Sequence, residues 1–333
     1  MSPIVALMVG FGLLVLGGEL LVRGAVRAAE CFGISALVIG IVLVGFGTSV
    51  PEMIISIYAA IQGSPGIAIG NIVGSSIANI LFILGLSAVF RPLAVTSKSL
   101  SRDGIVLMSS AIIFSIISLT YSLNRFVGFA LLMWLLGYIV YAWRQESTVT
   151  ECDENTGNQI QSKTFQHHTS ILWINRLQTL IYSNFSAILA LLLSVIGLCT
   201  LIIGGKFLVD GVVEIARAYK VKEEIIGLTV VAVGTSMPEL VTSIVASLRK
   251  QPAVAVGNIL GSNIYNVLGV GGVLGLAVPT IVPEHIAYQD NFIMIASCLA
   301  LLIFARSGLR ITRLEGAILF AAYIIYVYSL LPR

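Results

Sequence analysis

A six-residue sequence that contains a proline and a glutamate occurs twice in this chain, each time inside a long apolar segment. The first copy, Gly-Thr-Ser-Val-Pro-Glu, occupies residues 47–52 within the apolar segment 34–61. The second copy, Gly-Thr-Ser-Met-Pro-Glu, occupies residues 234–239 within the segment 225–248, at an offset of 187 residues. A carboxylate in the hydrocarbon of a membrane is costly unless it meets water, a partner or a cation. The two glutamates are therefore candidates for a function rather than for packing.

The composition indicates a membrane protein that crosses the bilayer several times. Hydrophobic residues make up 57% of the 333 residues, charged residues make up 11%, and the mean hydropathy is +1.00. Soluble proteins have about half apolar and a quarter charged residues. The net charge of +3 is small and spread over the chain, so no nucleic-acid partner is expected. The four cysteines are scattered without a C-x-x-C pair, which predicts neither a disulfide framework nor a zinc site.

The lengths of the apolar segments predict an all-α membrane protein with ten transmembrane helices. A hydrocarbon core about 30 Å thick requires about 20 apolar residues in each helix. The first segment has neither a basic leading region nor a clear cleavage site, so we expect a retained span and not a signal peptide. The ten segments are 3–22, 34–61, 65–90, 104–121, 126–143, 184–209, 222–248, 252–278, 289–305 and 312–331.

The distribution of Lys and Arg predicts the orientation of the spans. Basic residues collect on the cytoplasmic side of short loops. If the N-terminus is outside, thirteen of the nineteen Lys and Arg residues fall on the cytoplasmic side. We therefore expect both termini outside, in a prokaryotic inner membrane, with an organellar membrane as the alternative.

The repeat extends well beyond the six-residue motif. At the same offset, the sequence Gly-Asn-Ile-x-Gly-Ser at 70–75 recurs at 257–262, and Asn79 corresponds to Asn266. Five predicted spans separate equivalent positions, and an odd number reverses the direction of the chain. The sequence thus predicts an inverted-topology repeat, an arrangement typical of secondary transporters with an ion site at the midplane. The expected divisions are a first five-helix repeat, a cytoplasmic linker and a second five-helix repeat, at 1–143, 144–182 and 183–333.

The proline of each motif predicts an interruption of its helix. Pro51 has no N–H to donate to the carbonyl of Gly47, and its ring crowds that carbonyl, so the helix must kink or open there. Pro238 acts in the same way on Gly234. Irregular backbone at membrane depth is tolerated only where it is buried in protein or lines a cavity. The freed carbonyls are therefore candidate cation ligands.

The polar side chains around the two glutamates are all oxygen ligands. Thr48 and Ser49 precede Glu52 by four and three residues, and so lie on the same side of a helix as Glu52. Hard oxygen ligands in a flexible arrangement suit Ca²⁺ and Na⁺, not zinc or copper. One Ca²⁺, or a larger number of Na⁺ ions, would neutralise the glutamate pair, so the two ions can compete for one site. Residues with the same chemistry at matching positions are Glu239, Thr235, Ser236, Ser75, Ser262, Asn79 and Asn266. Asn71 and Asn258 fit either helix-end capping or ion contact.

These motifs, present twice in ten predicted spans, resemble the two alpha-repeats of the sodium/calcium exchanger family within the calcium/cation antiporter superfamily. The resemblance implies that Glu52 and Glu239 are the central Ca²⁺ ligands and that the spans 3–22 and 184–209 slide past the motif spans. Asn266 falls where some members carry an aspartate, which leaves K⁺ dependence and coupling open. The resemblance further implies oxygen ligands from Thr48 and Thr235, flanking Na⁺ sites at Ser49, Ser75, Ser236 and Ser262, and contributing carbonyls at Gly45 and Ala232.

The sequence favours an antiporter that exchanges Na⁺ for Ca²⁺ by alternating access, with no cofactor besides the transported ions. An H⁺/Ca²⁺ or K⁺-dependent Na⁺/Ca²⁺ exchanger is the alternative, because a glutamate pair can also carry protons. A cation channel is less favoured, since such a channel more often builds its pore from several identical chains. An intramembrane enzyme ranks last, because Ser49 and Ser236 have no His or Lys within their motifs. Stoichiometry, direction of transport and oligomeric state are left open.

Overall fold

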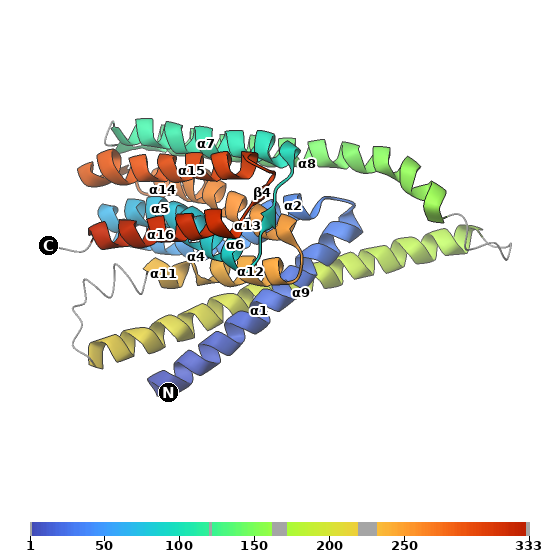
Figure 1. The fold of residues 1–333 in the computed structure, drawn as a ribbon, viewed down its shortest axis with the longest axis horizontal. Helices are drawn as coiled ribbons and strands as arrows, with labels where there is room; N and C mark the ends of the chain where they lie inside the picture. Colours follow the sequence, from blue (N-terminus) through green and yellow to red (C-terminus); the bar gives the residue numbers. More distant parts are fainter. Residues whose placement is uncertain (1, 120–121, 162–171, 219–231, 331–333) are drawn as a thin grey trace.

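The computed structural model describes residues 2–119, 122–161, 172–218 and 232–330, and this part of the chain is almost entirely helical. Figure 1 shows the helices. The first part of the chain contains α1 (Pro3–Phe32), α2 (Ala36–Ile39), the π-helix η1 (Gly40–Gly45), α3 (Phe46–Thr48), α4 (Val50–Ile61), α5 (Pro65–Ala78), the π-helix η2 (Asn79–Leu84), α6 (Gly85–Phe90), α7 (Ser97–Leu119) and α8 (Arg125–Gln161). The remainder contains α9 (Leu172–Ala218), α11 (Ala232–Thr235), α12 (Met237–Leu248), α13 (Pro252–Ile264), the π-helices η4 (Tyr265–Val270) and η5 (Ile286–Asp290), α14 (Gly271–Ala277), α15 (Asn291–Arg306) and α16 (Arg313–Leu330).

Nine helical stretches in the described residues are long and apolar enough to cross a membrane. They coincide with nine of the ten predicted segments. The predicted span 222–248 is represented by the short helices α11 and α12, and its beginning lies outside the described residues. The tenth span therefore stays a prediction. The linker predicted at 144–182 includes the end of α8 and the start of α9, and residues 162–171 are outside the described part.

Two pairs of short antiparallel strands connect distant parts of the sequence. The strand β1 (Leu93–Ala94) pairs with β4 (Arg310–Ile311), and β2 (Ser122–Leu123) pairs with β3 (Thr280–Ile281). An offset of 187 converts β1 into β3, and an offset of 188 converts β2 into β4. The two strand pairs thus correspond to each other under the offset that relates the two motifs, to within one residue.

The helices that carry the repeated motifs lie at the centre of the molecule. The stretches Pro65–Phe90 and Pro252–Ala277 are the most buried of the nine. The segments α7, α8, α15 and α16 surround them, with α7 against α15, α8 against α14 and α16 against α6. Glycines allow a close contact at the centre, where a Cβ on Gly257 would lie 3.2 Å from the Cα of Gly40. The segments η1 and α13 are therefore packed backbone to backbone.

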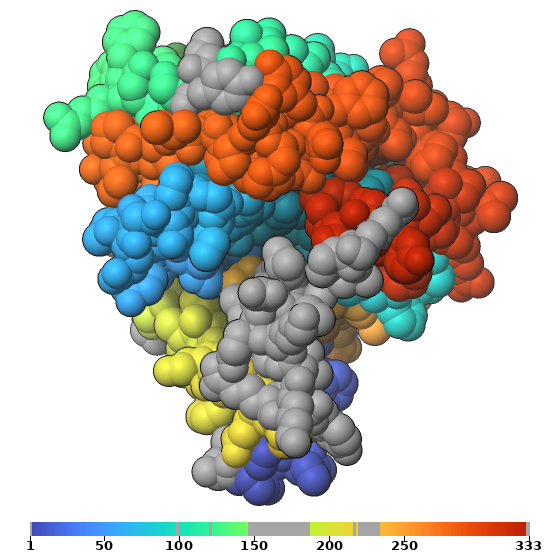
Figure 2. Space-filling view, turned by 90° about the vertical axis from the view of Figure 1, so that its left-hand side faces the viewer, coloured from blue at the N-terminus to red at the C-terminus, as the bar shows by residue number. Residues whose placement is uncertain are grey.

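Helices α1 and α9 cross each other beside this central bundle (Figure 1) and form the tapering lower part of Figure 2. A Cβ on Gly17 would lie 2.7 Å from the backbone nitrogen of Leu201 and 2.8 Å from the carbonyl oxygen of Gly197. A Cβ on Gly204 would lie 2.8 Å from the nitrogen of Leu14. Small residues at such positions let two membrane helices approach closely. The two helices are held together by backbone contact along their length.

The ends of α1 follow from its sequence. The Oγ of Ser2 accepts a hydrogen bond from the N–H of Val5 at 3.4 Å, and Pro3 occupies the first turn, where its missing N–H has no cost. Gly33 ends the helix with a φ of 63°, a conformation that glycine adopts easily. Helix α1 therefore ends at Gly33, before the first motif span begins.

One ion pair connects α1 to the end of α12. The guanidinium of Arg249 contacts both carboxylate oxygens of Glu19, at 2.5 Å and 2.7 Å, and Arg23 contacts the same carboxylate at 2.5 Å. The equivalent positions in the other half, at the offset of 187, are Lys206 and Gln62. These two residues cannot form an ion pair, so this contact has no counterpart in the other half.

We expect Gly17→Val to destabilise the protein, because the new side chain would meet backbone atoms of α9 that cannot move without separating the helices. Overpacking of this kind costs about 1–3 kcal/mol. Gly12→Val is the matched control, since a Cβ at Gly12 meets nothing within 4 Å. Thermal unfolding of purified protein in detergent should show a lower midpoint for Gly17→Val only. Equal midpoints for the two variants would contradict the close packing of α1 on α9.

Candidate ion-binding site

Each motif lies at a short interruption between two helices. Ser49 separates α3 from α4 with φ −83° and ψ 0°, and Ser236 separates α11 from α12 with φ −90° and ψ 10°. Pro51 and Pro238 are in the first turn of the following helix, which explains why the interruption precedes them. The N–H of Ser49 still donates to the carbonyl of Gly45 at 3.2 Å. The interruption predicted from the prolines is therefore confined to about one residue.

The two glutamates are buried without a basic partner. Glu52 and Glu239 are each only 1% exposed. Neither forms an ion pair with a basic residue in the described part of the chain. The Oγ of Ser236 donates a hydrogen bond to Oε1 of Glu52 at 3.4 Å, so the second motif contacts the carboxylate of the first.

Thr48 joins the first motif to the second half of the chain. Its hydroxyl lies 3.4 Å from the carbonyl oxygen of Gly45, 3.2 Å from Oδ1 of Asn258 and 3.2 Å from Oγ of Ser262. A Cβ on Gly45 would lie 3.0 Å from the backbone nitrogen of Ser262. The structure thus brings together three of the residues that the sequence predicts as ligands, namely Gly45, Thr48 and Ser262.

Three further predicted residues are buried and have side-chain atoms without hydrogen-bonding partners. They are Ser49 between α3 and α4, Asn79 at the first position of η2, and Asn266 at the second position of η4. Each is 1% exposed. The amide groups of both asparagines are unpaired at nitrogen and oxygen. Ser75 is also buried, and its Oγ donates to Oδ1 of Asn71 at 3.5 Å.

The structure describes less of the second motif's surroundings. Thr235 is half-buried at the end of α11, and Ala232 begins that helix. Nothing further is described of the Ala232 side chain, and residues 219–231 lie outside the described part. The counterpart of the contact between Gly45 and Ser262 therefore stays a prediction.

The unpaired oxygens are suited to a hard cation. Oxygens without partners are found on Ser49, Glu52, Glu239, Asn79 and Asn266. A buried polar atom without a hydrogen bond costs about 1–3 kcal/mol, and an uncompensated charge costs more. Carboxylate, amide and hydroxyl oxygens are the groups that coordinate Ca²⁺. A bound cation would compensate several of these groups at once.

Two asparagines whose role the sequence left open make the same contacts in each half. Nδ2 of Asn71 donates to the carbonyl oxygen of Glu52, and Nδ2 of Asn258 donates to the carbonyl oxygen of Glu239. Each also donates to a buried serine four residues after the glutamate, Ser56 or Ser243. The repeat is the signal that identifies these serines in the sequence, because they correspond at the offset of 187.

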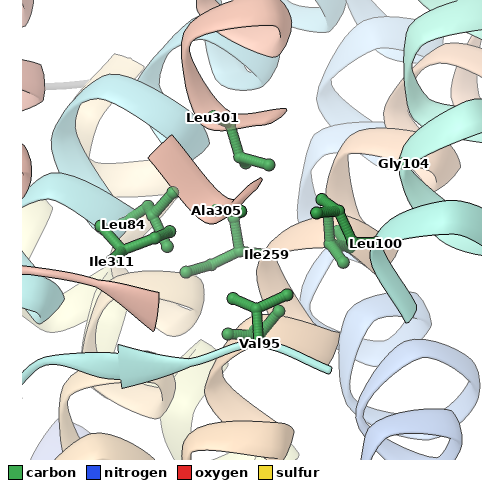
Figure 3. Close-up of a pocket in the computed structure, with 10 residues that line it drawn as sticks. Leu84, Val95, Leu100, Gly104, Ile259, Leu301, Ala305 and Ile311 are labelled. Atoms are coloured by element: carbon green, nitrogen blue, oxygen red, sulfur yellow. The ribbon is translucent and has the colours of Figure 1, made fainter. Parts of the chain in front are cut away.

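A small cavity on the other side of α13 is apolar and separate from these oxygens (Figure 3). Its volume is about 10 Å³, and no lining side chain contains oxygen or nitrogen. Helix α13 therefore has an apolar face, which includes Ile259, and a polar face, which includes Asn258 and Ser262. The lining residues are Leu84, Val95, Leu100, Gly104, Val256, Ile259, Leu260, Leu301, Ala305 and Ile311.

Comparison with known proteins identifies the family. The family described as sodium/calcium exchanger protein matches residues 2–144 and 189–331. The chain is 31% identical to the sodium/calcium exchanger MaX1 of Methanosarcina acetivorans over 349 residues, which cover 97% of both chains. It is 31% identical to the inner membrane protein YrbG of Escherichia coli over 333 residues, 97% of this chain and 95% of YrbG.

The fold is also similar to that of a solved exchanger. The structure of the sodium-calcium exchanger NCX_Mj soaked with Na⁺ and Ca²⁺ superposes with a TM-score of 0.81, at 29% identity, over 100% of both chains. The residues described above lie in the matched regions. The chain is an integral multi-pass membrane protein and belongs to the sodium/calcium exchanger protein family.

Proposed function

We propose that this protein is a secondary antiporter that exchanges Na⁺ for Ca²⁺ across the membrane. Family membership supports cation exchange that includes Ca²⁺. The relative MaX1 is named a sodium/calcium exchanger, and NCX_Mj was soaked with both ions. The observation that carries the proposal is the pair of buried carboxylates, Glu52 and Glu239, that have no basic partner in the described residues.

In this proposal, the two glutamates bind Ca²⁺ directly and Na⁺ ions compete for the same oxygens. Two ionised carboxylates are balanced by one Ca²⁺ or by Na⁺ ions in greater number. Thr48, Thr235 and the carbonyls of Gly45 and Ala232 add ligands to the central ion. Flanking Na⁺ sites are assigned to Ser49, Ser75, Ser236 and Ser262, with Asn79 and Asn266 contributing amide oxygens. No cofactor is proposed, because the ions are cargo.

Proton/calcium exchange is the second candidate. The observation in its favour is that each buried carboxylate has an unpaired oxygen, since such an oxygen can hold a proton as well as contact a metal ion. Asn266 carries an uncharged amide, so the predicted ligand set contains two carboxylates and no third. The two candidates differ in the gradient that drives Ca²⁺ movement.

Alternating access is proposed to occur by movement of α1 and α9 across the central helices. Gly17-Gly18 in α1 and Gly204-Gly205 in α9 form two glycine pairs at the offset of 187. Within each pair, one residue faces the partner helix and the other faces the central helices. Gly17 faces α9, whereas a Cβ on Gly18 would lie 3.0 Å from Cγ1 of Val241 in α12. Gly205 faces the carbonyl oxygen of Gly234, at 3.9 Å from its Cβ position. Gly18 and Gly205, which face the central helices, have no side chains that would block the sliding of α1 and α9.

The proposed location is a prokaryotic inner membrane with both termini outside. The excess of Lys and Arg on the predicted cytoplasmic side supports this orientation. The name of the relative YrbG, an inner membrane protein, supports the location.

We expect Ca²⁺ uptake into sealed vesicles to be driven by an outward Na⁺ gradient and not by a pH gradient. Glu52→Gln and Glu239→Gln should each reduce this uptake at least about 100-fold, which corresponds to about 2.7 kcal/mol, because each removes a charge that balances the ion. Glu30→Gln, which removes an exposed carboxylate at the end of α1, should leave uptake within twofold. Uptake driven by the pH gradient would support proton exchange, and full activity of Glu239→Gln would contradict the assigned site.

A disulfide between α1 and α12 should stop transport without stopping ion binding. The variant combines Gly18→Cys and Val241→Cys in a background in which the four native cysteines are replaced by serine. Oxidation should abolish Ca²⁺ flux, reduction should restore it, and Ca²⁺ binding to the purified oxidised protein should persist. The two single-cysteine variants are the controls. Normal flux through fully oxidised protein would contradict the sliding of α1.

A further inference from the structure

We propose that Asn258 and Asn71 are positioning residues of the ion site, and that Asn258 orients the hydroxyl of Thr48 toward the bound ion. This inference rests on the proposed function, because it assigns a role within the same site. In this role, Asn258 does not touch the cation. It accepts a hydrogen bond from the Thr48 hydroxyl and thereby leaves a lone pair of the hydroxyl oxygen free for the cation.

The first support is that each asparagine has both of its amide hydrogens engaged. Nδ2 of Asn258 lies 3.2 Å from the carbonyl oxygen of Glu239 and 2.9 Å from Oγ of Ser243. The corresponding distances for Asn71 are 3.1 Å to the carbonyl oxygen of Glu52 and 3.0 Å to Oγ of Ser56. A side-chain amide has two N–H donors. Each amide is therefore held in one orientation, with only Oδ1 left for another contact.

The second support is the direction of the bond between Asn258 and Thr48. Oδ1 of Asn258 is an acceptor only, so the Thr48 hydroxyl, 3.2 Å away, donates to it. Among the other oxygens near this hydroxyl, the carbonyl of Gly45 is more distant, at 3.4 Å, Oγ of Ser262 can itself donate, and the Glu239 carboxylate interacts with the hydroxyl without a formed hydrogen bond. The bond to Asn258 is thus the shorter of the two contacts in which the hydroxyl must be the donor.

The direction of that proton matters for a cation ligand. A hydroxyl has one hydrogen and two lone pairs, and a hard cation is bound through the oxygen lone pairs. A hydroxyl hydrogen that points at the cation would repel it. Asn258 and Thr48 are both fully buried. Their hydrogen bond therefore favours an orientation of the hydroxyl that leaves a lone pair available to an ion.

This contact also connects the two halves of the chain. Thr48 belongs to the first motif, whereas Asn258 holds the backbone of Glu239 in the second. A single asparagine thus contacts a hydroxyl ligand of one half and the backbone of the acidic ligand of the other. Asn71 makes the matching contacts around Glu52, whereas its Oδ1 accepts from Oγ of Ser75, in its own half, at 3.5 Å.

A double-mutant cycle on Ca²⁺ binding tests this role. The variants are Thr48→Val, Asn258→Leu and their combination, each close in size to the native side chain, and the readout is the Ca²⁺ dissociation constant of purified protein. If Asn258 acts through the Thr48 hydroxyl, each single variant should weaken binding about tenfold and the double variant should be no weaker than either. Additive losses would overturn the proposal, because contacts that do not interact give additive effects.

Asn263→Leu is the matched control. Asn263 is on the same helix, is 1% exposed, and donates from Nδ2 to the carbonyl oxygen of Ile259 at 2.7 Å, without a contact to a predicted ligand. Its replacement should change the dissociation constant less than twofold. A loss equal to that of Asn258→Leu would show that any buried polar change in α13 has this effect, and would overturn the assignment.

A second cycle keeps the test decisive if Asn258→Leu does not fold. It pairs Asn71→Leu with Ser75→Ala in the other half and measures the Na⁺ dissociation constant, because Ser75 is assigned to a flanking Na⁺ site. The same non-additivity is expected there. The variant Glu52→Gln distinguishes failure of the positioning role from failure of the proposed function. If Glu52→Gln abolishes Ca²⁺ binding while both cycles are additive, the proposed function stands and the positioning role fails. If Glu52→Gln binds Ca²⁺ normally, the proposed function itself fails.

Discussion

The structure depends on two carboxylates buried in the interior of a membrane protein without a basic residue beside them in the described part of the chain. Burial of an unpaired charge is so costly that the surrounding atoms must supply an alternative. Here that alternative consists of hydroxyl, amide and backbone oxygens from η1, α3, η2, α13 and η4. None of these groups neutralises charge alone. A mobile cation is the species that such a cluster is suited to hold.

Close approach of the two halves follows from residues without side chains. A Cβ on Gly45 would lie 3.1 Å from the carbonyl carbon of Gly261, and a Cβ on Gly261 would lie 2.9 Å from the Cα of Ile41. With larger residues, the segments η1 and α13 would separate and Thr48 would lose its contacts with Asn258 and Ser262. The glycines around the motifs therefore set the spacing of the polar groups, although they bind nothing through side chains.

The sequence was sufficient to predict the helical membrane class and the family, because each rests on a local pattern. Apolar length identifies spans, and the recurrence of Glu52 and Thr48 at one offset identifies the motifs. The contacts of Asn71 and Asn258 could not be predicted, because the direction of an amide depends on the neighbouring helix. The ion pair of Glu19 with Arg249 was missed for a similar reason, since the two residues are 230 positions apart. The role of each predicted ligand stays a prediction.

The crossing of α1 and α9 has a consequence for leakage. Because Gly17, Gly197 and Gly204 place the two backbones in direct contact, neither helix can shift far without carrying the other. In the proposed movement, α1 and α9 close one side of the membrane when they open the other. If they move as one rigid body, both sides cannot be open at the same time, and no continuous aqueous path would connect the two compartments. The glycine contacts between α1 and α9 would then prevent uncoupled leakage of either ion, although these glycines bind no ion themselves.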